Sequence, residues 1–307
     1  MSARNHASDE NAAGFIKRHP LASFFGLAFA GSWALAVILR VYLQATGTPV
    51  TMTQAGPVAL LILGIADAFP SVAGIVLTRV IGGKKGVRGL FGRLNPRRAG
   101  VKWYAVAILL NPIVVTVVLL VLAATISPDF EPAILKNPTL MVALPFALFI
   151  GLTAGTLEEF GWTGFALPRL LDRYNAFSAT IMLGIIWALW HVPLIVWVWP
   201  AVRSSNAALL IGGGLIWCAA LIPYRILMSW VYVNTDASLL SGIIMHAFYD
   251  ATLAALLPAT LAPVAIAQFY AALSVALWIA VAVVVALFGA KNLMRESGPT
   301  PRTAVPT

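Results

Sequence analysis

Five polar residues that could carry out hydrolysis lie in apolar stretches of this sequence: Glu158, Glu159, His191, His246 and Asp250. Burying an ionisable group in hydrocarbon costs about 2.5–3.5 kcal/mol even on a lenient insertion scale, so such residues usually have a function. Two imidazoles and a carboxylate are a common ligand set for a catalytic zinc, whose bound water attacks carbonyl groups. We therefore expect a divalent metal, zinc as first choice, held by Glu158, His191 and His246. The alternative is that Glu158 activates water directly as a general base.

The spacing of these residues indicates which of them can act together. Glu158 and Glu159 are neighbours and point about 100° apart on a helix, so one should face the site while the other makes a structural bond. His246 and Asp250 are four residues apart and share a helix face, so both can address one point. Because a charged carboxylate would repel a developing oxyanion, we expect Asp250 to bind the metal or orient His246.

Other polar and aromatic residues in the apolar stretches have simpler explanations. Trp187 precedes His191 by four residues and shares its helix face, where it is expected to form an aromatic wall. A lone intramembrane histidine often donates a hydrogen bond between helices, which is the structural alternative for His191. Asp67, Arg79 and Arg225 are assigned packing or interface roles.

Composition predicts the elements that position these residues. The 307 residues are 60% hydrophobic and 10% charged, whereas a soluble domain has roughly 25% charged residues. Continuous apolar runs of about 20 residues predict membrane-spanning helices rather than barrel strands. The expected class is thus an all-α polytopic membrane protein with about eight transmembrane helices and a buried polar site. The spans are expected near residues 21–44, 57–81, 103–126, 139–166, 176–199, 207–233, 238–257 and 263–289.

The positions of the charges predict how the chain crosses the membrane. The net charge of +9 comes largely from basic residues between apolar runs, which predicts contact with membrane lipids and no nucleic-acid partner. Between the second and third spans lie Lys84, Lys85, Arg88, Arg93, Arg97, Arg98 and Lys102. The next loop carries Asp129 and Glu131. Positive loops stay cytoplasmic, so both termini are expected in the cytosol, with the protein in the cytoplasmic membrane.

This topology divides the chain into three parts. Residues 1–20 are expected to form a cytosolic N-terminal segment, residues 21–290 the transmembrane helical domain, and residues 291–307 a disordered cytosolic tail. The single cysteine, Cys218, excludes an intramolecular disulfide.

Three segments resemble, in order, the signatures of the CPBP family, which joins CAAX prenyl endopeptidases, bacteriocin-processing proteins and Abi-type membrane proteins. The family pattern is Glu-Glu-x-x-x-Arg, then Phe-x-x-x-His, then His-x-x-x-Asn or Asp. Here the segments are Glu158-Glu159-Phe-Gly-Trp-Thr163, Trp187-Ala-Leu-Trp-His191 and His246-Ala-Phe-Tyr-Asp250. The resemblance covers about residues 140–255.

The resemblance implies an eight-helix fold and a metal-dependent intramembrane endopeptidase of the type II CAAX prenyl endopeptidase kind. Its substrate would be a membrane-associated or lipidated peptide, such as a prenylated CAAX-type tail. Glu158 and His191 would activate water, and His246 with Asp250 would bind metal or stabilise the oxyanion. Glu159 and Trp187 would support the site.

Two positions depart from the family pattern. Trp187 replaces phenylalanine and keeps an aromatic wall. Thr163 replaces arginine and removes a cation that could pair with Glu159, and Arg169 lies too far along the chain to substitute for it. This second departure favours the alternative function, a non-catalytic membrane protein such as an immunity factor, scaffold or transporter, whereas the presence of every residue proposed to activate water favours the peptidase, which is the function expected here. For Glu158 to meet the two histidines, its helix must continue inward to about Pro168.

Overall fold

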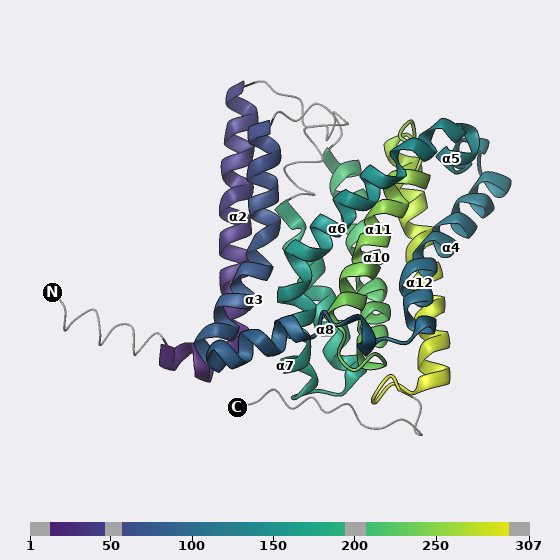
Figure 1. Ribbon diagram of the computed structural model, residues 1–307. Coiled ribbons are helices and arrows are strands. Elements are labelled where there is room, and N and C mark those ends of the chain that lie inside the picture. Colours follow the sequence, from purple (N-terminus) through teal and green to yellow (C-terminus); the bar gives the residue numbers. More distant parts are fainter. Residues whose placement is uncertain (1–12, 47–56, 194–206, 295–307) are drawn as a thin grey trace.

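The structure is a computed structural model that describes residues 13–46, 57–193 and 207–294. Within these ranges the chain is helical and has no strand. The long helices are α2 (Pro20–Thr46), α3 (Pro57–Gly92), α4 (Val101–Thr125), α6 (Leu144–Gly161), α8 (Ala176–Trp190), α10 (Ala207–Val233), α11 (Leu239–Leu256) and α12 (Pro263–Phe288) (Figure 1). Short segments between them are η1 (Pro96–Arg98), η2 (Pro128–Phe130), α5 (Ala133–Lys136), η3 (Pro138–Ala143), η4 (Trp162–Ala166) and α7 (Leu167–Leu171).

The expected all-α membrane architecture is confirmed. Seven stretches of the described chain are long and apolar enough to cross a membrane: α2, α3, α4, the run Pro138–Leu171, Ile211–Val233 of α10, α11 and α12. The fifth expected span, 176–199, appears in the described residues as the shorter helix α8, with His191 as its C-cap. The chain turns at His191, and Val192 and Pro193 are helical again. Residues 194–199 of that span lie outside the described ranges, as do residues 1–12 and 295–307 of the expected terminal segments.

A sharp turn at Gly83 separates α3 into two parts. Gly83 has φ 60° and ψ −154°, a conformation that is easily adopted only by glycine. The part before Gly83 runs alongside α2, and the part after it runs across the end of the helix bundle (Figure 1). The second expected span therefore ends close to its expected limit at residue 81. The exposed Lys84, Lys85 and Arg88 lie on the crossing part.

The helix that carries the glutamate pair continues inward, as expected. Helix α6 leads at Gly161 into the π-helical turn η4 and then into α7, which contains Pro168. The π-helical turn was not predicted. Such turns often occur inside α-helices at functional sites, and here it begins three residues after Glu159.

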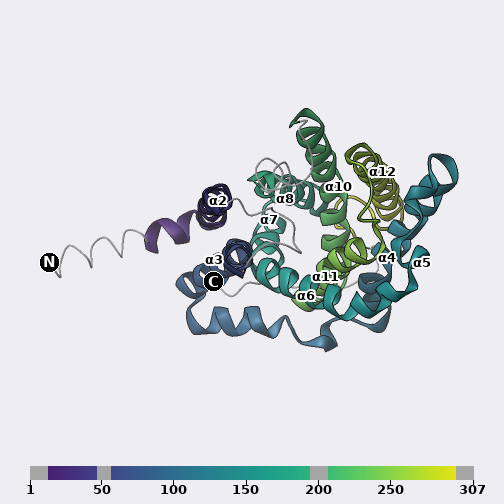
Figure 2. The ribbon, with the colours of Figure 1, turned by 90° about the horizontal axis from the view of Figure 1, so that it is seen from above.

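Glycines allow α6 to approach its neighbours closely. A Cβ atom added at Gly151 would lie 2.3 Å from the carbonyl oxygen of Ala247 in α11, and one at Gly161 would lie 2.2 Å from that of Pro70 in α3. Small residues permit this backbone approach in membrane helices. Seen from above, α2 and α3 form one side of the molecule and α4, α10 and α12 the other, with α6, α8 and α11 between them (Figure 2). The polar residues lie on these inner helices and on α10.

Candidate active site

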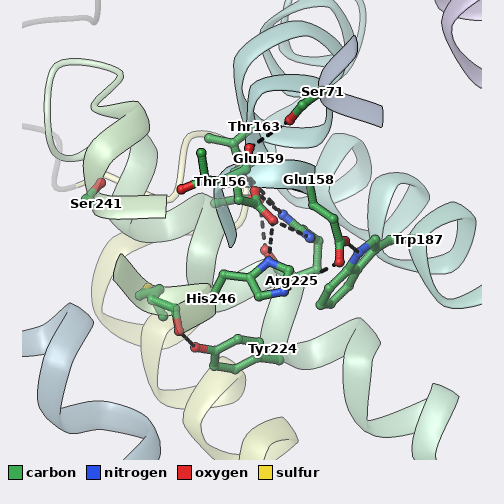
Figure 3. A network of polar contacts seen from close by, with 12 residues as sticks. Ser71, Thr156, Glu158, Glu159, Thr163, Trp187, Tyr224, Arg225, Ser241 and His246 are labelled. Carbon is green, nitrogen blue, oxygen red and sulfur yellow. Dashed lines mark hydrogen bonds and ion pairs between the residues drawn. The ribbon is translucent and has the colours of Figure 1, made fainter. Parts of the chain in front are cut away.

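The carboxylates of Glu158 and Glu159 are both buried, with 4% and 0% of the residue exposed. Glu158 Oε2 accepts a hydrogen bond from Trp187 Nε1 at 2.8 Å. Glu159 accepts hydrogen bonds from Arg225, from the hydroxyl of Thr163 and from His246. The two neighbours thus have different partners, and Glu159 is the one held by a structural bond (Figure 3).

His246 connects the two glutamates. Its Nδ1 lies 2.8 Å from Glu159 Oε1, and its Nε2 lies 3.7 Å from Glu158 Oε1 and 3.6 Å from Asp250 Oδ2. Because an ionised carboxylate only accepts hydrogen bonds, Glu159 fixes the proton of the imidazole on Nδ1. The other nitrogen is then directed towards Glu158 and Asp250. The side chain of Asp250 is 34% exposed, so it marks the more open edge of the cluster.

His191, like His246, packs against Trp187. Its Nδ1 is 2.8 Å from the carbonyl oxygen of Trp187, to which it donates, so that its Nε2 is also the nitrogen left for other partners. The ring of Trp187 packs edge-on against both imidazoles, with centroids 5.1 Å from His191 and 5.7 Å from His246. Trp190 and Trp217 complete an aromatic enclosure around His191.

Arg225 has a different role from the packing or interface role expected from sequence. It is fully buried in α10 and forms an ion pair with Glu159, from Nη1 to Oε2 at 2.8 Å and from Nη2 to Oε1 at 3.0 Å. Its Cζ also lies 3.9 Å from the centroid of the Trp187 ring. The family pattern places a cation for Glu159 four residues further along the same helix, whereas in this chain the cation comes from a different helix. An arginine in an apolar span was the available signal.

Asp67 of α3, which was expected to have a packing or interface role, lies in the inner part of the helix bundle. It is half-buried and within electrostatic range of Glu158, Asp250 and His246. It also lines an apolar groove between α2, α3 and the end of α8, together with Ser32, Trp33, Leu39, Leu63 and Trp190. Arg79, by contrast, is exposed on α3.

The donor set suits a metal ion. Potential ligand atoms of Glu158, Glu159 and His246 lie within 4.8 Å of one another, and in the described chain His191 is not part of this group. A histidine that binds a metal through one ring nitrogen commonly donates a hydrogen bond from the other to a carboxylate or a backbone carbonyl. Both His191 and His246 make such a bond through Nδ1. Since Glu159 is occupied by Arg225, the atoms left to bind a metal from this group belong to Glu158 and His246.

Comparison with known proteins points to one family. Residues 139–252 match the family described as type II CAAX prenyl endopeptidase Rce1-like. The chain is also 37% identical over 99 residues to CAAX prenyl protease 2 of Methanococcus maripaludis. That alignment covers 32% of this chain and 36% of the relative. The matched region contains all three polar segments and excludes α2 to α4.

Proposed function

We propose that this chain is an intramembrane endopeptidase, because residues 139–252 match the family described as type II CAAX prenyl endopeptidase Rce1-like. It hydrolyses a peptide bond in a membrane-associated, prenylated CAAX-type substrate. The observation that carries the proposal is the buried cluster in which Glu158 Oε1 faces His246 Nε2 at 3.7 Å. A water molecule or a substrate carbonyl beside these two atoms can contact both.

Glu158 is the residue proposed to move the proton. Trp187 holds one of its oxygens and leaves the other on the side of His246. In this position the carboxylate can accept a proton from water as the water attacks the scissile carbonyl, and can then deliver it to the leaving amine. His191 is proposed to assist through Nε2, since its Nδ1 is already bonded to the Trp187 carbonyl.

A divalent metal, zinc as first choice, would be held by Glu158 and His246, with His191 as the further ligand predicted from sequence. When bound, it would polarise the water and the scissile carbonyl. Asp250 lies 3.6 Å from His246 Nε2 and is proposed to orient that ring or to join the ligand set. In the absence of a metal ion, Glu158 alone would act as the general base.

The lipidated substrate is proposed from the similarity of residues 139–252 to type II CAAX prenyl endopeptidases. The groove that includes Trp33, Leu39, Leu63 and Trp190 has a volume of only about 30 Å³, which is too small for a prenyl chain, so the lipid part of the substrate would lie elsewhere against the apolar helices. We also propose that the termini are cytosolic, because the exposed Lys84, Lys85 and Arg88 lie on the same end of the bundle as the start of α2 and the end of α12 (Figure 1).

The experiment that tests the proposed function is a cleavage assay with purified protein in detergent. The substrates are CAAX-type peptides that carry a farnesyl, a geranylgeranyl or no lipid group, and products are identified by mass spectrometry. Wild type and the control Asp129→Asn, an exposed acid away from the site, should cleave a prenylated peptide, and Glu158→Gln should not. Equal cleavage of the unmodified peptide would contradict the prenyl assignment, and cleavage by Glu158→Gln would contradict the catalytic one.

A further inference from the structure

Arg225 connects two separate parts of the site. On one side its guanidinium donates two hydrogen bonds to Glu159, which in turn accepts from His246 Nδ1. On the other side it stacks on the ring of Trp187, whose indole nitrogen donates to Glu158. Arg225 therefore contacts Glu159, which is bonded to His246, and Trp187, which is bonded to Glu158 (Figure 3).

A structural role alone does not account for this arrangement. Taking two charges out of water is costly, and a buried ion pair is often no more stable than apolar residues of similar volume. Both side chains of this pair have 0% exposure. What the pair provides is geometry, since the planar guanidinium fixes a carboxylate at two points. The fixed Oε1 atom of Glu159 is the atom that accepts from His246 Nδ1.

We propose that Arg225 is a positioning residue of this site. It holds Glu159 and Trp187, and through them it sets the tautomer and orientation of His246 and the orientation of Glu158. The kinetic consequences of this inference rest on the proposed peptidase function, whereas its effect on His246 does not.

Position 163 is a second place in the chain from which a cationic side chain can reach Glu159. Thr163 lies four residues after Glu159, donates to its Oε2 atom and is 3.5 Å from Arg225 Nη1. A side chain at this position thus reaches the same carboxylate as Arg225, and the family pattern has arginine there. In this chain the cation comes from α10 instead. An arginine introduced at position 163 should therefore form the ion pair with Glu159 in place of Arg225, although it would not stack on Trp187.

The kinetic test compares Arg225→Ala, Arg225→Lys and the double variant Arg225→Ala/Thr163→Arg on a cleaved peptide. Loss of an outer partner of this kind typically costs about 10–100-fold, so Arg225→Ala should lower kcat by that factor with little change in KM. The double variant should recover most of the loss, because the alanine leaves room for the new side chain. Arg98→Ala is the matched control, since it removes an arginine–aspartate pair at 2.8 Å that is exposed; its kcat should equal that of wild type.

A second measurement does not depend on activity. The chain has four histidines, so ¹⁵N-histidine labelling gives a small set of signals, and His246→Gln assigns the one of interest. Wild type should show the Nδ1–H tautomer at His246, Arg225→Ala should lose this preference, and the double variant should regain it. If Arg225→Ala does not fold, Arg225→Lys and the double variant provide the same comparison.

An unchanged tautomer together with unchanged kcat in Arg225→Ala would overturn the proposal. A folded double variant that regains neither the Nδ1–H tautomer of His246 nor the wild-type kcat would also overturn the proposal. If the tautomer follows the cation while no peptide is cleaved by wild type, the positioning role stands and the proposed function fails. The two inferences can therefore be separated.

Discussion

The indole nitrogen of Trp187 donates a hydrogen bond to Glu158 Oε2 at 2.8 Å, between two buried side chains 29 residues apart in sequence. The bond joins α8 to α6 and leaves the second oxygen of Glu158 directed towards His246. The family pattern has phenylalanine at this position, which would keep the aromatic contact but make no such bond. Trp187 is therefore a participant in the geometry of Glu158 as well as a wall of the site.

Replacing Trp187 with phenylalanine tests this role. A hydrogen bond to a charged group is worth about 1.5–3 kcal/mol, so Trp187→Phe should lower kcat by roughly 10–100-fold if the bond orients Glu158 for the reaction. The folded state should persist, because the new ring can still pack against the two imidazoles. Steady-state kinetics and a thermal unfolding curve check both points. A variant with wild-type kcat would show that the bond does not orient the reacting carboxylate.

The approach of α6 to α11 should be sensitive to small changes in volume. Gly151→Ala would place a methyl group 2.3 Å from the Ala247 carbonyl oxygen, which forces the two helices apart. Overpacking of this kind costs about 1–3 kcal/mol and would also displace the glutamates from His246. The midpoint of unfolding in detergent should fall, together with activity. Gly89→Ala, where nothing lies within 4 Å, is the control and should leave both unchanged.

Metal analysis of the purified protein tests the ligand set. We expect one divalent metal per chain in wild type, its loss in His246→Ala, and its retention in His19→Ala, which changes an exposed histidine at the start of the bundle. His191→Ala distinguishes the ligand set predicted from sequence, which contains His191, from the described group of Glu158, Glu159 and His246. Equal metal content in wild type and His246→Ala would contradict a site at this cluster.

The proposed orientation predicts which side of the membrane each loop faces. In a Cys218→Ala background, Lys85→Cys should react with an impermeant maleimide only when the cytosolic side is accessible. Asp129→Cys, on the loop that contains η2, should react only from the opposite side. The residues at both positions are exposed. The reverse labelling pattern would contradict cytosolic termini.

Hydropathy made the architecture predictable, because spans of about 20 apolar residues have few alternatives in a membrane. The local backbone geometry was harder to predict from the sequence. The turn at Gly83 requires a left-handed conformation that the sequence marks only as one glycine in a Gly-Gly pair. The π-helical turn after Glu159 depends on how α6 packs, which no local pattern specifies.

The candidate site shows the same division. Spacing along a helix was enough to predict that Glu158 and Glu159 have different partners and that His246 lies beside Asp250. The partner of Glu159 was missed, since Arg225 lies 66 residues away in sequence and reaches it through the packing of α10. The hydrogen bond from Trp187 was missed for a similar reason, because an aromatic residue in a span is usually only a packing residue. Both interactions depend on how the helices pack against one another, which the local sequence does not show.

The most direct test of the central claim is the rate at which the protein cleaves a farnesylated CAAX-type peptide in lipid nanodiscs, measured for wild type and Glu158→Gln at equal protein concentration. A positioned general base contributes about 10²–10⁴-fold to such a reaction. Glutamine keeps the size of the side chain and can still accept from Trp187, but it cannot take a proton from water. A fall in kcat of that size, with the variant still folded, is the predicted result, whereas cleavage by Glu158→Gln within tenfold of wild type would contradict the assignment.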